Sequence, residues 1–180
     1  PQLARNPIHQ LVPALSELCA IEWDQGNEFY PATSFQISNI HGGSGADNVI
    51  PGSVQVWFNF RFSTAITVDQ LTQRTQALLD KFNLDYEINW RTSGLPFLTD
   101  SGRLLSSALD AIKSVTGIDT ALSTAGGTSD GRFVAPTGAE VIEIGPVNAT
   151  IHKINERVKV SELETLSKIY NTVLESLFPN

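Results

Sequence analysis

The chain has 180 residues, of which 41% are hydrophobic and 17% are charged, as in a folded globular protein and unlike a disordered one. Its formal net charge is -7 and its 12 basic residues are scattered, which argues against a nucleic-acid-binding protein with a basic face. No apolar run approaches the roughly 18 residues that a membrane-spanning helix needs. The length suits one large domain or two small ones.

The chain has one cysteine, Cys19, whose place in an apolar helical pattern predicts a small buried side chain. One thiol provides neither a disulfide framework nor a thiolate metal site, so we expect a cytoplasmic protein. No signal peptide is recognisable. The chain begins at Pro1 and contains no methionine, which indicates that Pro1 is an internal residue of a longer protein.

Two helices are predicted in the first half of the chain. Asn6 and Pro7 indicate the start of the first, because asparagine caps helix N-termini and proline suits the first helical position. Its inner face should consist of helically spaced apolar residues, namely Ile8, Leu11, Val12, Leu15 and Leu18. The second helix begins near Thr67, and its expected inner face is Leu71, Ala77, Leu78 and Phe82.

Alternating apolar residues predict strands over residues 33–40, 53–62 and 84–91, of which 53–62 is the clearest. A Gly-rich loop joins the first two strands. The order helix, strand, strand, helix, strand indicates an α+β fold with a ferredoxin-like antiparallel sheet and helices on one face. A further strand just before Pro1 would complete this motif.

The pattern changes after residues 93–96 (SGLP), beyond which short strands alternate with helices as in an α/β unit. Helices are predicted over 101–116, 132–135 and 160–178, with a strand over 139–144. Too few strands are present for a complete α/β sheet. We therefore expect residues 97–180 to be the end of a larger α/β domain that starts outside this chain.

The last helix carries two further predictions. Ser161 followed by Glu164 predicts a capping box at its start. Its inner stripe should consist of apolar residues at helical spacing, namely Leu163, Leu166, Ile169, Tyr170, Val173 and Leu177.

Of the three histidines, His9 and His41 are expected to be structural, whereas His152 has equal claims to a structural and a functional role. It lies in a loop after a short strand, where sites collect in α/β folds. A neutral imidazole is the commonest protein metal ligand. A zinc site needs three or four protein ligands, however, and no second histidine lies close in sequence. Any further ligands must come from elsewhere.

Residues 124–132 (TAGGTSDGR) form a second candidate site. Glycines allow backbone amides to approach a ligand, and Thr128 and Ser129 add hydroxyl groups. Arg132 presents a planar fork that suits a carboxylate. The structural alternative is a tight turn between a strand and a helix. The segment has neither a Walker lysine pattern nor a GxSxG elbow, which disfavours phosphate binding and a serine nucleophile.

Asn48 and Arg61 form a third group. Asn48 follows Asp47 in a stretch that could also be a turn entering a strand. Arg61 lies on the polar face of the strand over 53–62, where a solvent-exposed arginine is the alternative.

The segments GGTSDGRF (126–133) and GPVNATIHKINE (145–156) resemble the dinuclear-zinc aminoacylase and carboxypeptidase superfamily, of peptidase M20 type. Three upstream segments match in the same order, namely NPIH, WDQGNEF and DNVIP. The resemblance covers essentially the whole chain. It is strongest to members that hydrolyse N-succinyl-LL-2,6-diaminopimelate to succinate and LL-diaminopimelate in lysine biosynthesis.

The resemblance implies that residues 1–94 are a lid and dimerisation domain, and residues 95–180 the C-terminal part of a catalytic domain. It implies a homodimer formed through the lid and two zinc ions per active site, with cobalt as a substitute. The general-base glutamate and the other metal ligands of the superfamily have no counterpart here. We therefore expect the isolated chain to be inactive and to bind little or no zinc.

Residue by residue, the resemblance assigns His152 as a metal ligand. It assigns substrate contacts to six residues, namely Asn48, Arg61, Ser93, Thr128, Arg132 and Asn148. Asn48 is expected to reach the active site of the partner subunit, although Asp47 stands where the superfamily commonly has asparagine. Two alternatives stay open: a related deacylase or peptidase with another acyl group, and a module for dimerisation only.

Overall fold

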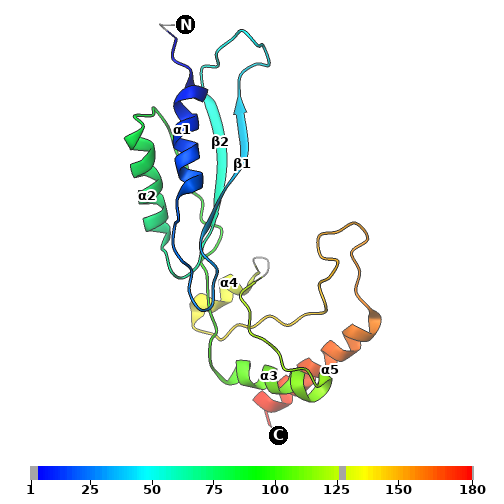
Figure 1. Ribbon diagram of the computed structural model, residues 1–180. Helices are drawn as coiled ribbons and strands as arrows, with labels where there is room; N and C mark the ends of the chain where they lie inside the picture. Colours follow the sequence, from blue (N-terminus) through cyan, green and yellow to red (C-terminus); the bar gives the residue numbers. More distant parts are fainter. Residues whose placement is uncertain (1–3, 126–128, 180) are drawn as a thin grey trace. The chain divides into compact units, whose positions relative to one another are not determined.

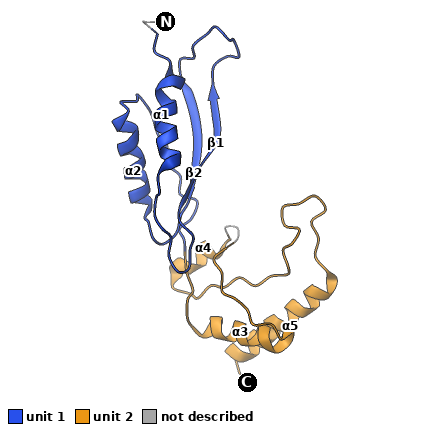
Figure 2. Ribbon diagram, in the orientation of Figure 1, with its two compact units in different colours: residues 1–96 blue, residues 97–180 orange. Residues whose placement is uncertain are grey.

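The computed structural model describes residues 4–125 and 129–179 (Figure 1). Its elements, in chain order, are α1 (Pro7–Ala20), β1 (Ser34–Gly42), β2 (Val54–Arg61), α2 (Val68–Lys81), α3 (Arg103–Thr116), α4 (Gly131–Val134), a 3-10 helix (Ala135–Thr137) and α5 (Val160–Leu177). Figure 2 shows the two compact units, Pro1–Pro96 and Phe97–Asn180. The predicted α+β class is confirmed. Within the described ranges, no helix combines the length and the apolar character of a membrane span.

The first unit contains a two-stranded antiparallel sheet with α1 and α2 lying beside each other on one face (Figure 1). The register runs from Ser34 opposite Arg61 to Gly42 opposite Val54. Burial alternates strictly along β2, where the half-buried residues are Val54, Val56, Phe58 and Phe60 and the intervening residues are exposed. This alternation confirms the face assignment that the sequence predicted for β2.

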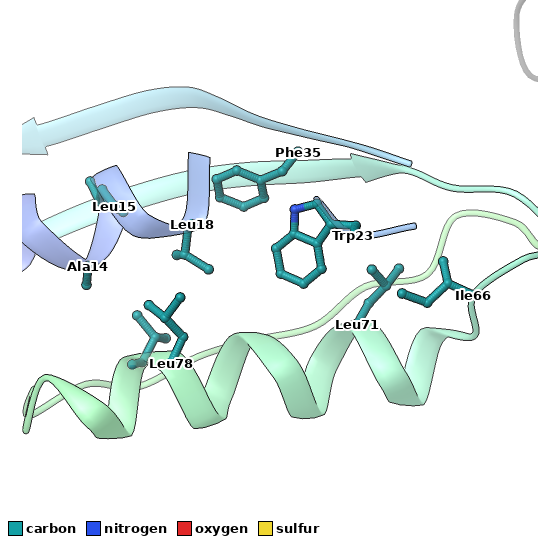
Figure 3. Close-up of a cluster of buried hydrophobic side chains, with 9 residues drawn as sticks. Ala14, Leu15, Leu18, Trp23, Phe35, Ile66, Leu71 and Leu78 are labelled. Carbon is teal, nitrogen blue, oxygen red and sulfur yellow. The ribbon is translucent and has the colours of Figure 1, made fainter. Parts of the chain in front are cut away.

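Trp23 lies at the centre of the core of the first unit. Its side chain is 4% exposed, and Figure 3 shows its ring between the sheet and α2. The ring of Phe60 meets it edge-on at 4.6 Å between centroids. The Arg74 guanidinium lies 5.0 Å from the centroid of the Trp23 ring and donates hydrogen bonds to the carbonyl groups of Trp23 and Glu22. Arg74 thus ties α2 to the segment that follows α1.

Two helix starts follow their sequence signals and one does not. Asn6 caps α1 as predicted, because its Oδ1 atom accepts hydrogen bonds from the amides of Ile8 at 3.0 Å and His9 at 3.4 Å. Thr67 and Gln70 form a reciprocal capping box at α2. The capping box predicted at Ser161 is wrong, because α5 already begins at Val160 and places this serine inside its first turn.

Several inner-face predictions for the helices of the first unit are wrong. Ile8 and Val12 are 39% and 55% exposed, so the buried stripe of α1 is narrower than its apolar stripe and consists of Ala14, Leu15 and Leu18. Cys19 is exposed. On α2 the predicted inner residue Ala77 is exposed, whereas Thr75 is buried. The Thr75 hydroxyl donates a hydrogen bond to the Leu71 carbonyl at 2.8 Å.

The strands predicted over 84–91 and 139–144 are wrong, because neither segment finds a hydrogen-bonding strand partner among the described residues. The alternating apolar residues of both segments nevertheless identify the side chains that pack against a core. Every second side chain of the first segment, namely Leu84, Tyr86 and Ile88, packs against the core of its unit. Ile142 and Ile144 pack against the core of the second unit.

In the second unit, α3 packs against α5 through small and branched side chains. The buried members of this core are Ala108, Ala111, Ile169 and Val173. The Arg103 guanidinium also donates to the Leu177 carbonyl at 2.8 Å. The predicted inner residues Leu163 and Tyr170 are 47% and 45% exposed, so the buried stripe of α5 is narrower than predicted.

The expected division after residue 94 lies two residues before the boundary between the units at Pro96. The assignment of the units as a lid and as part of a catalytic domain stays a prediction. So does the ferredoxin-like sheet, which needs more strands than the described residues contain.

Candidate functional site

Asn48 lies in the loop that joins β1 to β2. With Asn6 and Ile8 of the α1 start, this loop lines an open cavity of about 470 Å³. Gly43 and Gly45 have φ angles of 79° and 87°, a left-handed conformation that glycine adopts without strain. All residues from His41, near the end of β1, to Ile50 in this loop are exposed. Asn48 is therefore accessible to another molecule.

Arg61 lies at the opposite end of β2 from this loop. The register pairs Gly42 with Val54 beside the loop and Ser34 with Arg61 at the far end. At about 3.3 Å per residue, the length of β2 separates the two ends by roughly 23 Å. A single chain therefore does not bring Asn48 and Arg61 into one site. Ser93 is exposed in the segment between α2 and α3.

Two of the three histidines, His9 and His41, lie on the first unit. His41 meets Trp57 edge-on, with 5.3 Å between ring centroids, which agrees with the structural role expected of it. His9 is exposed in the first turn of α1.

Arg132 lies on α4, with its guanidinium carbon 4.7 Å from the centroid of the Phe133 ring. Its Nε atom is buried and has no hydrogen-bond partner among the described residues. A buried donor without a partner is uncommon in folded proteins and suggests a group that is satisfied by something else. Ser129 accepts a hydrogen bond from the Gly131 amide at 3.1 Å, as the turn interpretation of this segment expects. Thr128 lies outside the described residues.

Asn148 and His152 lie in the loop that leads into α5, and both are exposed. The Asn148 carbonyl accepts a hydrogen bond from the Ile151 amide at 3.0 Å, and His152 has a φ of 60°. Among the described residues, no hydrogen bond or ion pair joins Arg132 to either of them. Nowhere in residues 4–125 and 129–179 do three or more His, Cys, Asp or Glu side chains form a group that could hold a metal ion. His152 is thus a single donor.

Asp24 holds the backbone of the segment after α1, a role that the sequence analysis did not predict. Its Oδ1 atom accepts hydrogen bonds from the amides of Gly26 at 2.7 Å and Thr33 at 3.0 Å. Burial raises the pKa of this carboxyl, but the Thr33 hydroxyl, these two amides and the charge of Arg74 together lower the pKa below its usual 3.8. The Asp-x-Gly spacing, typical of a turn, was the available signal.

Comparisons with known proteins agree with the resemblance seen in the motifs. Residues 1–87 match the model of the peptidase dimerisation domain family. Over 177 residues the chain is 62% identical to the succinyl-diaminopimelate desuccinylase of Acinetobacter baumannii strain AYE, covering 98% of this chain and 47% of that protein. The desuccinylase of Shewanella piezotolerans is also 62% identical, with 98% of this chain and 46% of that protein covered.

The chain spans about half the length of these curated relatives. A solved structure of the di-peptidase Dug1p from Saccharomyces cerevisiae matches 99% of this chain and 41% of its own, with a TM-score of 0.58 and 20% identity, which supports the fold alone. Residues 1–87 thus resemble the peptidase dimerisation domain, and the chain is similar over 98% of its length to about half of the succinyl-diaminopimelate desuccinylases.

Proposed function

We propose that this chain is part of a zinc-dependent amide hydrolase that cleaves N-succinyl-LL-2,6-diaminopimelate to succinate and LL-diaminopimelate. The observation that carries the proposal is the 62% identity to succinyl-diaminopimelate desuccinylases over 98% of the chain. This activity would serve the biosynthesis of diaminopimelate and lysine. A cytoplasmic location is part of the proposal, because a chain with one cysteine has no disulfide framework of the kind that an oxidising compartment favours.

This chain provides one residue, His152, that suits the proposed zinc site. An exposed imidazole such as that of His152 suits zinc or cobalt, but a catalytic zinc site needs about three protein ligands. The described residues supply no further cluster. His152 would thus hold one of two zinc ions when the remaining ligands come from outside the described residues. A bound zinc would supply a Lewis acid beside the amide.

The substrate has several carboxylates, and we assign their recognition to side chains of this chain. Arg132 offers a fork of donors, and its buried Nε atom has no hydrogen-bond partner among the residues that the structure describes. Asn148 would contribute an amide near His152. Thr128, which precedes Ser129 in the sequence, and Ser93, in the segment between α2 and α3, would also contact the substrate.

The family match over residues 1–87 supports a homodimer formed through the first unit. Asn48 would then reach the active site of the partner subunit from its exposed loop. The length of β2 separates Asn48 from Arg61, so the two would contact different sites or different parts of the substrate. We expect sedimentation of this chain at high micromolar concentration to show a discrete dimer, and a monomeric mass would count against this assignment.

The experiment that tests the activity is a substrate panel on a full-length protein that carries this sequence. Hydrolysis of N-succinyl-LL-2,6-diaminopimelate should exceed that of N-acetyl amides and dipeptides by a large factor. A preference for another acyl group would favour a related deacylase or peptidase. A module for dimerisation only would show no zinc and no hydrolysis even in the full-length protein.

A further inference from the structure

Thr150 fastens the loop that carries His152. Its Oγ1 atom donates a hydrogen bond to the Arg157 carbonyl at 2.9 Å and accepts one from the Arg157 amide at 3.0 Å. One hydroxyl thus satisfies both backbone groups of a residue seven positions further along the chain. We call this pair of hydrogen bonds the Thr150–Arg157 clasp.

Inside the clasp the backbone runs through successive tight turns. The Lys153 amide donates to the Thr150 carbonyl at 3.1 Å, and the Glu156 amide donates to the Lys153 carbonyl at 3.2 Å. His152 is the third residue of the turn that Thr150 opens, and its φ is 60°. A positive φ is unfavourable for a residue other than glycine and persists where the surroundings hold it.

Burial does not hold the imidazole in place. Thr150 is half-buried, whereas every residue from Ile151 to Val160 is exposed. Hydrogen bonds within the loop must therefore set the backbone of His152. The clasp closes the two ends of the segment that contains it, so its loss would free all of the enclosed turns at once.

We infer that Thr150 is a positioning residue for His152, and that the clasp holds the backbone of His152 where its imidazole can reach a metal ion. This inference rests on the proposed function, because it assumes that His152 is a ligand. Groups that orient a ligand from outside the coordination sphere typically change metal affinity about 10- to 100-fold when they are removed. The geometry requires the hydroxyl of Thr150 and not its methyl group.

The test compares Thr150→Val, which keeps the shape and removes the hydroxyl, with Thr150→Ser, which keeps the hydroxyl. Thr172→Val is the matched control, because Thr172 is also a half-buried threonine whose hydroxyl donates to one carbonyl, that of Lys168 at 3.0 Å. In this chain, NMR hydrogen exchange should show the Arg157 amide protected in Thr150→Ser and unprotected in Thr150→Val.

In a full-length protein that carries this sequence, zinc affinity is measured by competition with a chelator. Thr150→Val should weaken zinc binding about 10- to 100-fold, with Thr150→Ser and Thr172→Val close to the parent. Thr150→Ala is the second variant without the hydroxyl and should behave like Thr150→Val. If both fail to fold, Thr150 is a general stabilising residue and the inference is wrong.

Failure of the inference is distinct from failure of the proposed function. Unchanged zinc affinity in Thr150→Val, together with tight zinc and desuccinylase activity in the parent, would overturn the positioning role alone. A parent protein without zinc and without hydrolysis of the succinyl amide would overturn the proposed function, and the inference with it.

Discussion

The carboxylate of Glu140 caps a helix that begins far away in the sequence. Its Oε2 atom accepts a hydrogen bond from the amide of Leu104, 36 residues earlier, at 2.7 Å. The residue that precedes α3 is Gly102, which has no side chain to offer, and no other side-chain cap is present at this described helix start. A negative charge at a helix N-terminus is favourable because the first backbone amides lack partners within the helix.

Replacing Glu140 with Ala should therefore lower the free energy of unfolding by about 1 kcal/mol, the usual cost of losing a helix cap. Glu140→Gln keeps an acceptor oxygen and should cost less. Urea unfolding followed by circular dichroism measures both. Glu143→Ala, at an exposed position of the same segment, is the control and should be nearly neutral. Equal effects at Glu140 and Glu143 would contradict the capping role.

Gly102→Ala should disturb the same contact from the other side. A Cβ atom at Gly102 would clash with the carboxylate of Glu140, and the φ of 131° is itself unfavourable for alanine. Gly117→Ala tests the backbone effect without a clash, because Gly117 has a φ of 75° and open space where a Cβ atom would lie. We expect Gly102→Ala to be the more destabilising change. The excess should shrink in a Glu140→Ala background, where the clashing carboxylate is gone.

Asp24 should make stability depend on pH at the acid end. Its folded-state pKa lies below 3.8, so its contribution is fully present above that value and is lost as the pH falls through the lower, folded-state pKa. Asp24→Asn keeps an acceptor oxygen but has no charge to titrate. The difference in urea midpoint between the parent and Asp24→Asn should be largest near neutral pH and should shrink toward pH 2. Asp85→Asn, at an exposed position of the same unit, should show a smaller difference.

The ferredoxin-like proposal makes a prediction about residues 84–91. These residues pack half of their side chains on the core, and Trp90 meets Phe58 of β2 at 5.6 Å between ring centroids. In a βαββαβ arrangement their hydrogen-bonding partner would be a first strand that precedes Pro1. Alternate amides of this segment should therefore exchange slowly in a longer protein and quickly in this chain. Equal exchange in the two would argue against the ferredoxin-like sheet.

The proposed roles of Arg132 and His152 can be separated in the full-length protein. Arg132→Lys should lower kcat/KM by the equivalent of roughly 1.5–3 kcal/mol and leave zinc content intact, because a point charge cannot reproduce a bidentate carboxylate contact. His152→Ala should lower both zinc content and turnover. A kinetically silent Arg132→Lys, or a His152→Ala variant with full zinc and full rate, would show that the assignment is wrong.

Local chemistry was enough to predict most elements of this protein. The Asn6 cap, the alternation in β2 and the helices α2, α3 and α5 depend on interactions within a few residues, which the sequence specifies directly. The motif around His152 was likewise visible in the sequence. The backbone conformation of this motif could not be predicted. It depends on hydrogen bonds between the Thr150 hydroxyl and the Arg157 backbone, and no sequence periodicity predicts such a pair.

Contacts between distant segments decided the rest. Residues 84–91 alternate like a strand, yet a strand exists only where a neighbour supplies hydrogen bonds, and the described residues supply none. Four residues fit the apolar stripes of their helices but are exposed, namely Ile8, Val12, Leu163 and Tyr170. The buried width of a helix depends on the elements that pack against it, and the stripe alone does not determine it. The cap of α3 depends on Glu140, and only the folded chain brings that carboxylate to the Leu104 amide.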